Sequence, residues 1–139
     1  MSRLVLFVVA ALAGVAVMNA AEQSPSATVP GSKPKILVHL TNGPEHATRA
    51  ALAFLVARTA IEQGHAVSVF LAGDAVQLLR DATLDEVAGL GTGKLREHYD
   101  AIVNGGGRFY LSGMSSAARG ISAADLKGKP AGWPRRRCS

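Results

Sequence analysis

The sequence predicts one α/β domain built around a mostly parallel β-sheet. Three short apolar runs, over residues 36–40, 67–71 and 109–111, predict buried strands, and stretches with helical periodicity separate them. Strands that alternate with helices at this spacing are typical of βαβ units, in which right-handed crossovers join parallel strands. Three strands are fewer than an ordinary doubly wound sheet contains.

The first helix is expected over residues 44–63. Pro44 suits the first helical position, because the N–H that proline lacks would have no partner there, and Gly64 suits the position after the last turn. Apolar residues surround nearly the whole of this helix, which indicates that it is covered on more than one side. The sheet would supply one cover, and a second subunit could supply the other.

Polar residues predict where the later helices begin. Asp74 is expected to cap a short helix that reaches residue 79, Thr83 begins a capping box, and Ser115 is expected to cap a short helix that follows the third strand. Residues 94–104 form the most clearly amphipathic stretch of the chain.

Residues 1–21 have the layout of a secretory signal peptide. A positive charge at Arg3 precedes an uncharged apolar run over residues 4–18, and small residues follow. We therefore expect a bacterial protein that is exported to the periplasm or secreted. An uncleaved membrane anchor is the alternative, although the run is shorter than the ~20 apolar residues of a spanning helix. No later stretch is apolar enough to span a membrane, so no membrane association is expected after signal removal.

The remaining residues are expected to form a linker, the domain and a tail. Residues 22–34 contain three prolines and no periodicity, which indicates a flexible linker. The α/β domain is expected over residues 35–130, and residues 131–139 are expected to be a basic disordered tail. This tail contains Cys138, the only cysteine, which therefore cannot form an internal disulfide.

Composition excludes several classes of function. The formal net charge is +5, but arginines in the tail carry most of the excess, and the few aromatic residues do not alternate with basic ones. No nucleic-acid partner is therefore expected. The four histidines lack the short spacing of metal ligands, so no metal site is expected, and no cofactor is expected either.

Three loops follow the predicted strands, at the carboxyl edge where open α/β sheets bind ligands. The candidate ligand-binding residues in these loops are Asn42, Gly43, His46, Asp74, Ser112, Met114 and Arg119. Ser112 lies where a nucleophile would be placed, and His46 is the only candidate base that could activate it. A small Ser112-dependent hydrolase is therefore one hypothesis, although no third orienting group is evident and no catalytic residue is assigned.

Three segments together resemble the DsrE/DsrF-like family of sulfur-relay proteins. They are KILV with NGP (residues 35–38 and 42–44), FLAGDAV (residues 70–76) and GRFYLSGMSSAARGI (residues 107–121). The resemblance covers residues 35 to about 130. It implies a Rossmann-like, three-layer α/β domain that assembles into homo-oligomers, often trimers or hexamers.

The resemblance also implies where sulfur chemistry would occur. Relay members carry a persulfide on a cysteine at the end of the strand before the Ala-Arg-Gly segment, and the matching residue here is Ser112. Because a hydroxyl cannot hold a persulfide, we expect an oligomeric binding or accessory protein of sulfur metabolism, with a sulfur-metabolism protein as its partner. The alternative is a sulfur carrier that uses Cys138.

A second departure from the family concerns the C-terminus. Family members usually continue past the region of Asp125 and Leu126 into another helix and a final strand. The sequence here ends in GWPRRRCS instead, so that helix and strand are expected to be missing, as in a truncated or frame-shifted chain.

Overall fold

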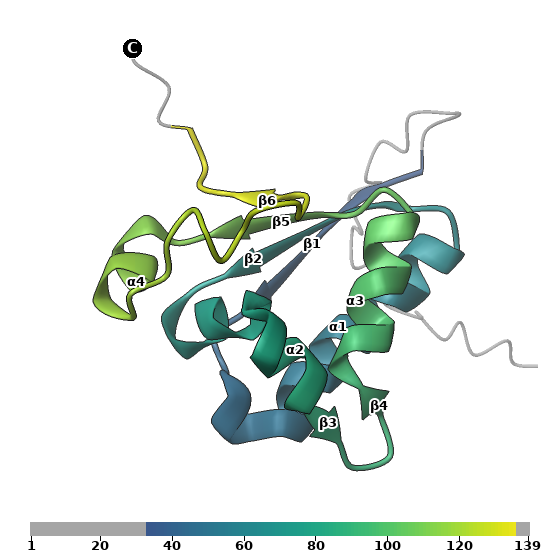
Figure 1. The fold of residues 1–139 in the computed structure, drawn as a ribbon. Helices are drawn as coiled ribbons and strands as arrows, with labels where there is room; N and C mark the ends of the chain where they lie inside the picture. The colour runs from purple at the N-terminus through teal and green to yellow at the C-terminus, as the bar shows by residue number, and fades with distance from the viewer. Residues whose placement is uncertain (1–32, 136–139) are drawn as a thin grey trace, which may run out of the picture. The chain divides into compact units, whose positions relative to one another are not determined.

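The computed structural model describes residues 33–135 and contains a small α/β domain (Figure 1). The predicted signal peptide, most of the predicted linker, and Cys138 lie outside the described residues. The strands are β1 (Lys35–Leu40), β2 (Ala66–Leu71), β3 (Ala88–Gly89), β4 (Gly93–Lys94), β5 (Arg108–Leu111) and β6 (Ala131–Gly132). The helices are α1 (Ala47–Glu62), α2 (Asp81–Glu86), α3 (Leu95–Asn104) and α4 (Gly113–Ala118), with 3₁₀ helices η1 (Pro44–His46) and η2 (Gly73–Leu79).

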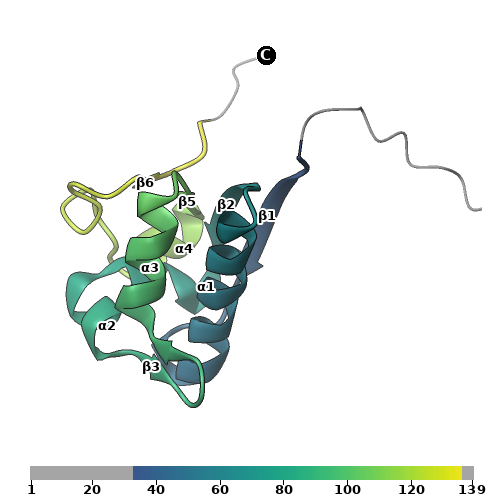
Figure 2. The same ribbon diagram turned by 90° about the vertical axis from the view of Figure 1, so that its right-hand side faces the viewer.

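The main sheet has four parallel strands in the order β1-β2-β5-β6. Along the chain, each new strand of this sheet is added beside the previous one, so the sheet grows from β1 toward β6. Right-handed crossovers in such an order place every connecting helix on the same face. Figure 2 shows this arrangement, with the four strands side by side and α1 and α3 on one side of them.

The hydrophobic core lies between the sheet and these helices. Phe54 of α1 and Tyr99 of α3 both pack against Phe109 of β5, with ring centroids 5.5 Å and 5.2 Å apart. Every second residue of β2 and β5 is buried on this face, and the residues between them are less buried. This alternation is typical of a sheet with only one face packed on a core.

The predicted α/β fold with a mostly parallel sheet is confirmed. Within residues 33–135, side chains on the second face of the sheet stay exposed, with Leu37 65% exposed, and the third layer expected there is not among the described elements. The predicted number of three strands was wrong, since β6 pairs with β5 in parallel. The two small residues of β6, Ala131 and Gly132, carry no strand signal in the sequence.

Three predicted helix starts also differ in the structure. Asp74 lies inside η2, whose N-cap is Ala72, and Thr83 lies inside α2. Ser112 caps α4, whereas Ser115 was predicted to cap it. The side chains of Asp74 and Ser115 instead bond to residues far away in the sequence, and local capping rules do not detect such partners. The first helix begins with the 3₁₀ turn η1 and becomes α-helical at Ala47.

The segment that contains β6 is held at three points. The N–H of Phe109 donates to the carbonyl of Pro130 over 2.9 Å, which starts the β5–β6 ladder. Lys129 Nζ donates to Asp81 Oδ2 at 3.0 Å, and Trp133 Nε1 donates to the hydroxyl of buried Ser116 at 3.1 Å. Residues 131–133 are therefore part of the folded domain, contrary to the prediction of a disordered tail from residue 131.

Asp81 connects this segment to the helical layer, and its charge gives a testable pH dependence. Hydrogen bonds from Lys129 and then Arg96 lower the pKa of Asp81 below its ordinary value of 3.8. The stabilising contribution of the carboxylate is thus complete above the ordinary pKa and is lost as the pH falls through the lower, folded pKa. We expect Asp81→Asn to lower the Tm at pH 7, and the difference from the wild type to shrink progressively once the pH falls below about 4.

Thermal unfolding followed by circular dichroism between pH 3 and pH 7 measures this difference. The control is Asp100→Asn on α3, because exposed Asp100 takes part in none of the ion pairs found within residues 33–135. A Tm difference for Asp81→Asn that stays constant down to pH 3 would show that the carboxylate charge does not hold the segment.

Candidate functional site

Three loops meet at the carboxyl edge of the sheet, as the parallel topology requires. The N–H of Ala75 donates to the carbonyl of Thr41 at 3.2 Å, which joins the first loop to the second. The N–H of Gly73 donates to Ser115 Oγ at 2.9 Å, which joins the second loop to the third. These bonds bring the candidate residues of three separate sequence segments to one edge.

Gly43 allows the first loop to lie close to the second. It is buried, and a Cβ atom at this position would stand 2.7 Å from Asp74 Cβ and 2.8 Å from the Asp74 carbonyl oxygen. Its N–H donates to Glu45 Oε1 at 2.9 Å. A larger residue would therefore push the two loops apart.

Asp74 and Arg119 form an ion pair across the second and third loops. Arg119 Nε donates to Asp74 Oδ1 at 2.7 Å, although the two residues are 45 positions apart in the sequence. Arg80 donates from Nη2 to the Arg119 carbonyl at 2.9 Å. These contacts fix the end of α4, and they give Asp74 and Arg119 a structural role at the edge of the site.

Ser112 lies between the end of β5 and the start of α4. Its N–H donates to the carbonyl of Leu71 at 2.9 Å, which continues the β2–β5 ladder. Its Oγ accepts from the N–H of Ser115 at 3.4 Å, so the hydroxyl serves as the N-cap of α4. The side chain is half-buried and remains accessible from one side.

A hollow of about 420 Å³ opens beside this hydroxyl. Its walls are mostly apolar, and they are formed by Phe70, Ser112, Gly113, Met114, Trp133 and Pro134. Met114 is 85% exposed at the rim. We call this cavity the Ser112 hollow. Trp133 is not among the residues predicted from the sequence, because only the pairing of β6 with β5 brings the C-terminal segment to Ser112.

The other candidates lie elsewhere along the edge. Asn42 and exposed His46 belong to the first loop and do not line the Ser112 hollow. A serine nucleophile requires a base, and within residues 33–135 no hydrogen bond joins the predicted base His46 to Ser112. The same range contains no group of three or more potential metal ligands, and none of its helices has the length and hydropathy to cross a membrane.

A scan against family models matches residues 34–133 to the DsrE/DsrF-like family. The chain belongs to the DsrE/DsrF-like family. A search of curated proteins finds no match. Membership in the DsrE/DsrF-like family agrees with the parallel α/β sheet and relates the protein to sulfur metabolism. The matched range includes β6 and Trp133, so every residue that lines the Ser112 hollow except Pro134 lies within it.

The close approach of Gly43 to Asp74 gives a prediction about the assembly of this edge. We expect Gly43→Ala to lower the free energy of unfolding by about 1–3 kcal/mol, as is typical of overpacking in a tight contact. The control is Gly132→Ala, because a Cβ at Gly132 would meet nothing within 4 Å, and we expect a change within ~0.5 kcal/mol for it. Denaturant unfolding measures both values. Equal stability of the two variants would contradict the packing described here.

Proposed function

We propose that the protein is an exported, oligomeric binding protein of sulfur metabolism that does not itself transfer persulfide sulfur. The observation that carries this proposal is the position of Ser112, at the end of β5 and beside an apolar hollow. The proposal draws on the resemblance to relay members, which carry their sulfur on a cysteine at the position that matches Ser112. We therefore propose that the hollow is the counterpart of the relay site, with an oxygen in place of the reactive sulfur.

The difference between the two atoms decides the chemistry. A cysteine thiolate is the nucleophile that forms persulfides and disulfides. A serine hydroxyl stays protonated at neutral pH unless a base activates it, and the Ser112 hydroxyl is engaged with the N–H of Ser115. The hollow can therefore accept a ligand or a partner residue next to Ser112, but Ser112 does not take up sulfur.

The outer face of α1 supports the oligomeric part of the proposal. Leu52 and Val56 are 48% and 51% exposed on it. A shallow hollow of about 370 Å³ lies beside them, lined by Leu55, Val56, Thr59, Ala60 and Gln63. Adjacent exposed apolar side chains on a helix are typical of an interface, so we propose that a second subunit covers this face, in a trimer or hexamer.

The proposal of export rests on the layout of residues 1–21, which have a charged start, an apolar run and small residues before the expected cleavage site. Export to the periplasm would separate the protein from cytosolic sulfur-relay proteins. A binding role without a reactive cysteine at Ser112 fits that location.

Polysulfide treatment followed by intact-mass measurement tests the proposed function. The wild type is expected to gain no sulfur. Ser112→Cys in a Cys138→Ser background is expected to gain the mass of one sulfur atom, which dithiothreitol removes. In that variant the thiolate takes one sulfur atom, and the polysulfide leaves one sulfur shorter.

Two results would contradict the proposal. A sulfur gain by the wild type that Cys138→Ser abolishes would establish a carrier that uses Cys138. No gain by the Ser112→Cys variant, with circular dichroism unchanged, would show that the Ser112 hollow does not admit a sulfur donor. Covalent labelling of the wild type by a serine-reactive probe, lost in Ser112→Ala, would establish the hydrolase hypothesis.

Native mass spectrometry of the protein from a periplasmic extract tests export and assembly together. We expect a subunit that has lost residues 1–20 or 1–21 and that forms a trimer or hexamer. Val56→Glu is expected to dissociate the oligomer, because it would bury a charge in an apolar interface. Full-length subunits in the membrane fraction would overturn the proposal of export, and a monomeric wild type would overturn that of assembly.

A further inference from the structure

The second face of the sheet carries a continuous set of exposed side chains. The parallel register aligns them in two rows across the strands. One row contains Leu37, Ser68 and Arg108, and the other contains His39, Phe70, Tyr110 and Gly132. The rings of His39 and Phe70 lie 5.3 Å apart. We call this surface the open face.

The open face is unusual for a parallel sheet, because such sheets normally have both faces covered. Leu37 is 65% exposed, and both Phe70 and Tyr110 are only half-buried. A helix of ~10 Å diameter spans about two strands that lie ~4.8 Å apart. A helix is therefore the element whose dimensions suit this face, as in the third layer of α/β domains.

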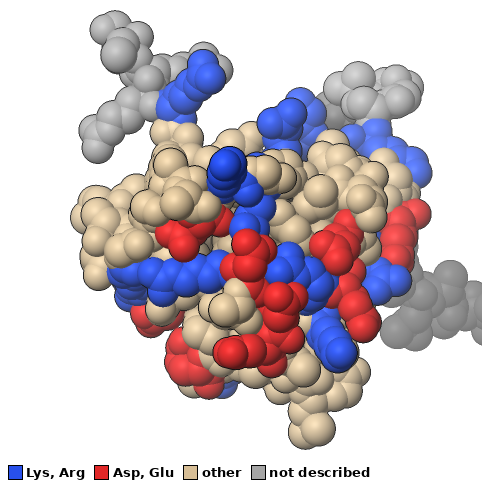
Figure 3. Space-filling view, in the orientation of Figure 1, with Lys and Arg blue, Asp and Glu red and all other residues tan. Residues whose placement is uncertain are grey.

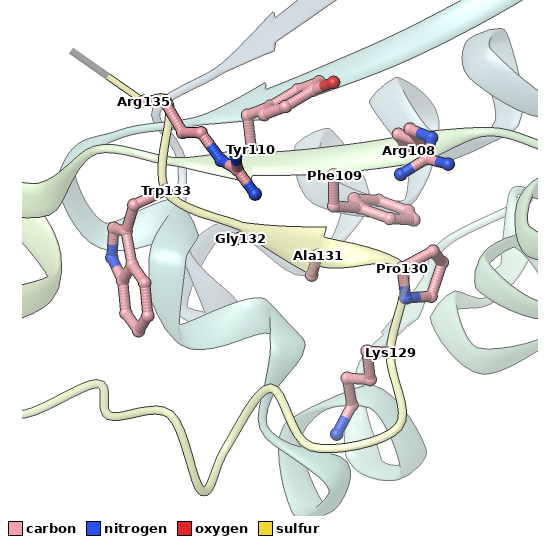
Figure 4. A pocket seen from close by; sticks show the side chains of 9 residues that line it. All are labelled: Arg108, Phe109, Tyr110, Lys129, Pro130, Ala131, Gly132, Trp133 and Arg135. Atoms are coloured by element: carbon pink, nitrogen blue, oxygen red, sulfur yellow. The ribbon is translucent and has the colours of Figure 1, made fainter.

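Three hollows follow one another along the open face and its edge at β6. One contains Lys35, Ser68 and Arg108 and has a volume of about 330 Å³. The next, of about 360 Å³, shares Arg108 with it and adds Tyr110 and Arg135 (Figure 4). The Ser112 hollow shares Trp133 with the second. A long ligand could thus contact the surface from the amino edge to the carboxyl edge.

The charged side chains that the four strands place on the open face are positive. Lys35, Arg108 and Arg135 are exposed, and none of the ion pairs found within residues 33–135 includes them. Lys129 also lines the second hollow, but it points away from Tyr110 in Figure 4 and is paired with Asp81. Strands β1, β2, β5 and β6 contain no acidic residue. Figure 3 shows acidic side chains gathered over the helical layer instead.

We propose that the open face binds an acidic amphipathic helix of a partner protein. The apolar stripe of the helix would pack on Leu37, Phe70 and Tyr110, and carboxylates on its flanks would pair with Arg108 and Arg135. A second copy of this face fits poorly, because a two-fold contact would bring the same arginines of both subunits together. This inference deepens the proposed binding role by giving the chemistry of the partner.

Binding of two designed peptides tests the inference. Both are helices of about 18 residues, ~27 Å long, with the same leucine stripe, but one has glutamates on its flanks and the other lysines. Trp133 is the only tryptophan in the sequence and lines two of the hollows, so its fluorescence reports binding. We expect saturable binding of the glutamate peptide that weakens with added salt, and at least about tenfold weaker binding of the lysine peptide.

Two variants of the full chain locate the contact. Arg108→Glu is expected to weaken binding of the glutamate peptide at least about tenfold, because it replaces attraction between opposite charges with repulsion between like charges. Lys94→Glu makes the same change of charge at an exposed position of β4, away from the open face, and is expected to have little effect. Leu37→Glu is expected to abolish binding while circular dichroism stays unchanged, since Leu37 is largely exposed.

Several outcomes would overturn the inference. One is equal affinity for the two peptides, and another is an equal effect of Arg108→Glu and Lys94→Glu on binding of the glutamate peptide. A third is tighter binding of a single-stranded oligonucleotide than of the glutamate peptide. The last is self-association of the protein that Leu37→Glu abolishes. None of these measurements depends on sulfur uptake. Failure of the peptide test would therefore count against the partner helix alone, and failure of the polysulfide test would count against the proposed function alone.

Discussion

The central position of β2 between β1 and β5 determines most of the other features of this protein. All six residues of β1 pair with β2 in parallel, and four residues of β2 pair with β5. Because the chain always moves in one direction across the sheet, α1 and α3 lie on one face, and the carboxyl ends of the strands meet at one edge. The Ser112 hollow and the open face both follow from this order.

Much of the fold could be predicted from the sequence because its signals are local. The strands β1, β2 and β5 were predicted to within one residue at each end, since runs such as Val67 to Leu71 combine apolar side chains with β-branching. The amphipathic stretch that became α3 was equally clear. The three loops at the carboxyl edge followed from the parallel topology alone.

The features that escaped prediction depend on partners that are distant in the sequence. Strand β6 has two small residues, and it exists because Pro130 and Lys129 are held by Phe109 and Asp81. Asp74 looked like a helix cap, but its partner is Arg119. The contribution of Trp133 to the site required the return of the chain along β5. Single-sequence patterns contain no signal for such contacts.

Family membership and the residue at the site carry different parts of the functional argument. The DsrE/DsrF-like match accounts for the fold and the relation to sulfur metabolism. The proposed function depends on one atom, because we propose that the oxygen of Ser112 leaves a binding surface where a thiolate would form a sulfur carrier. The open face adds a second surface, whose positive charge is independent of that atom.

The account depends above all on the sheet having one covered and one open face. Hydroxyl-radical footprinting of the purified protein measures this directly, because the sequence has only two tyrosines. Tyr110 lies on the open face, whereas Tyr99 is only 6% exposed in the core. The account predicts that Tyr110 is oxidised much faster than Tyr99. Equal protection of both tyrosines would contradict it, since the second face would then be covered.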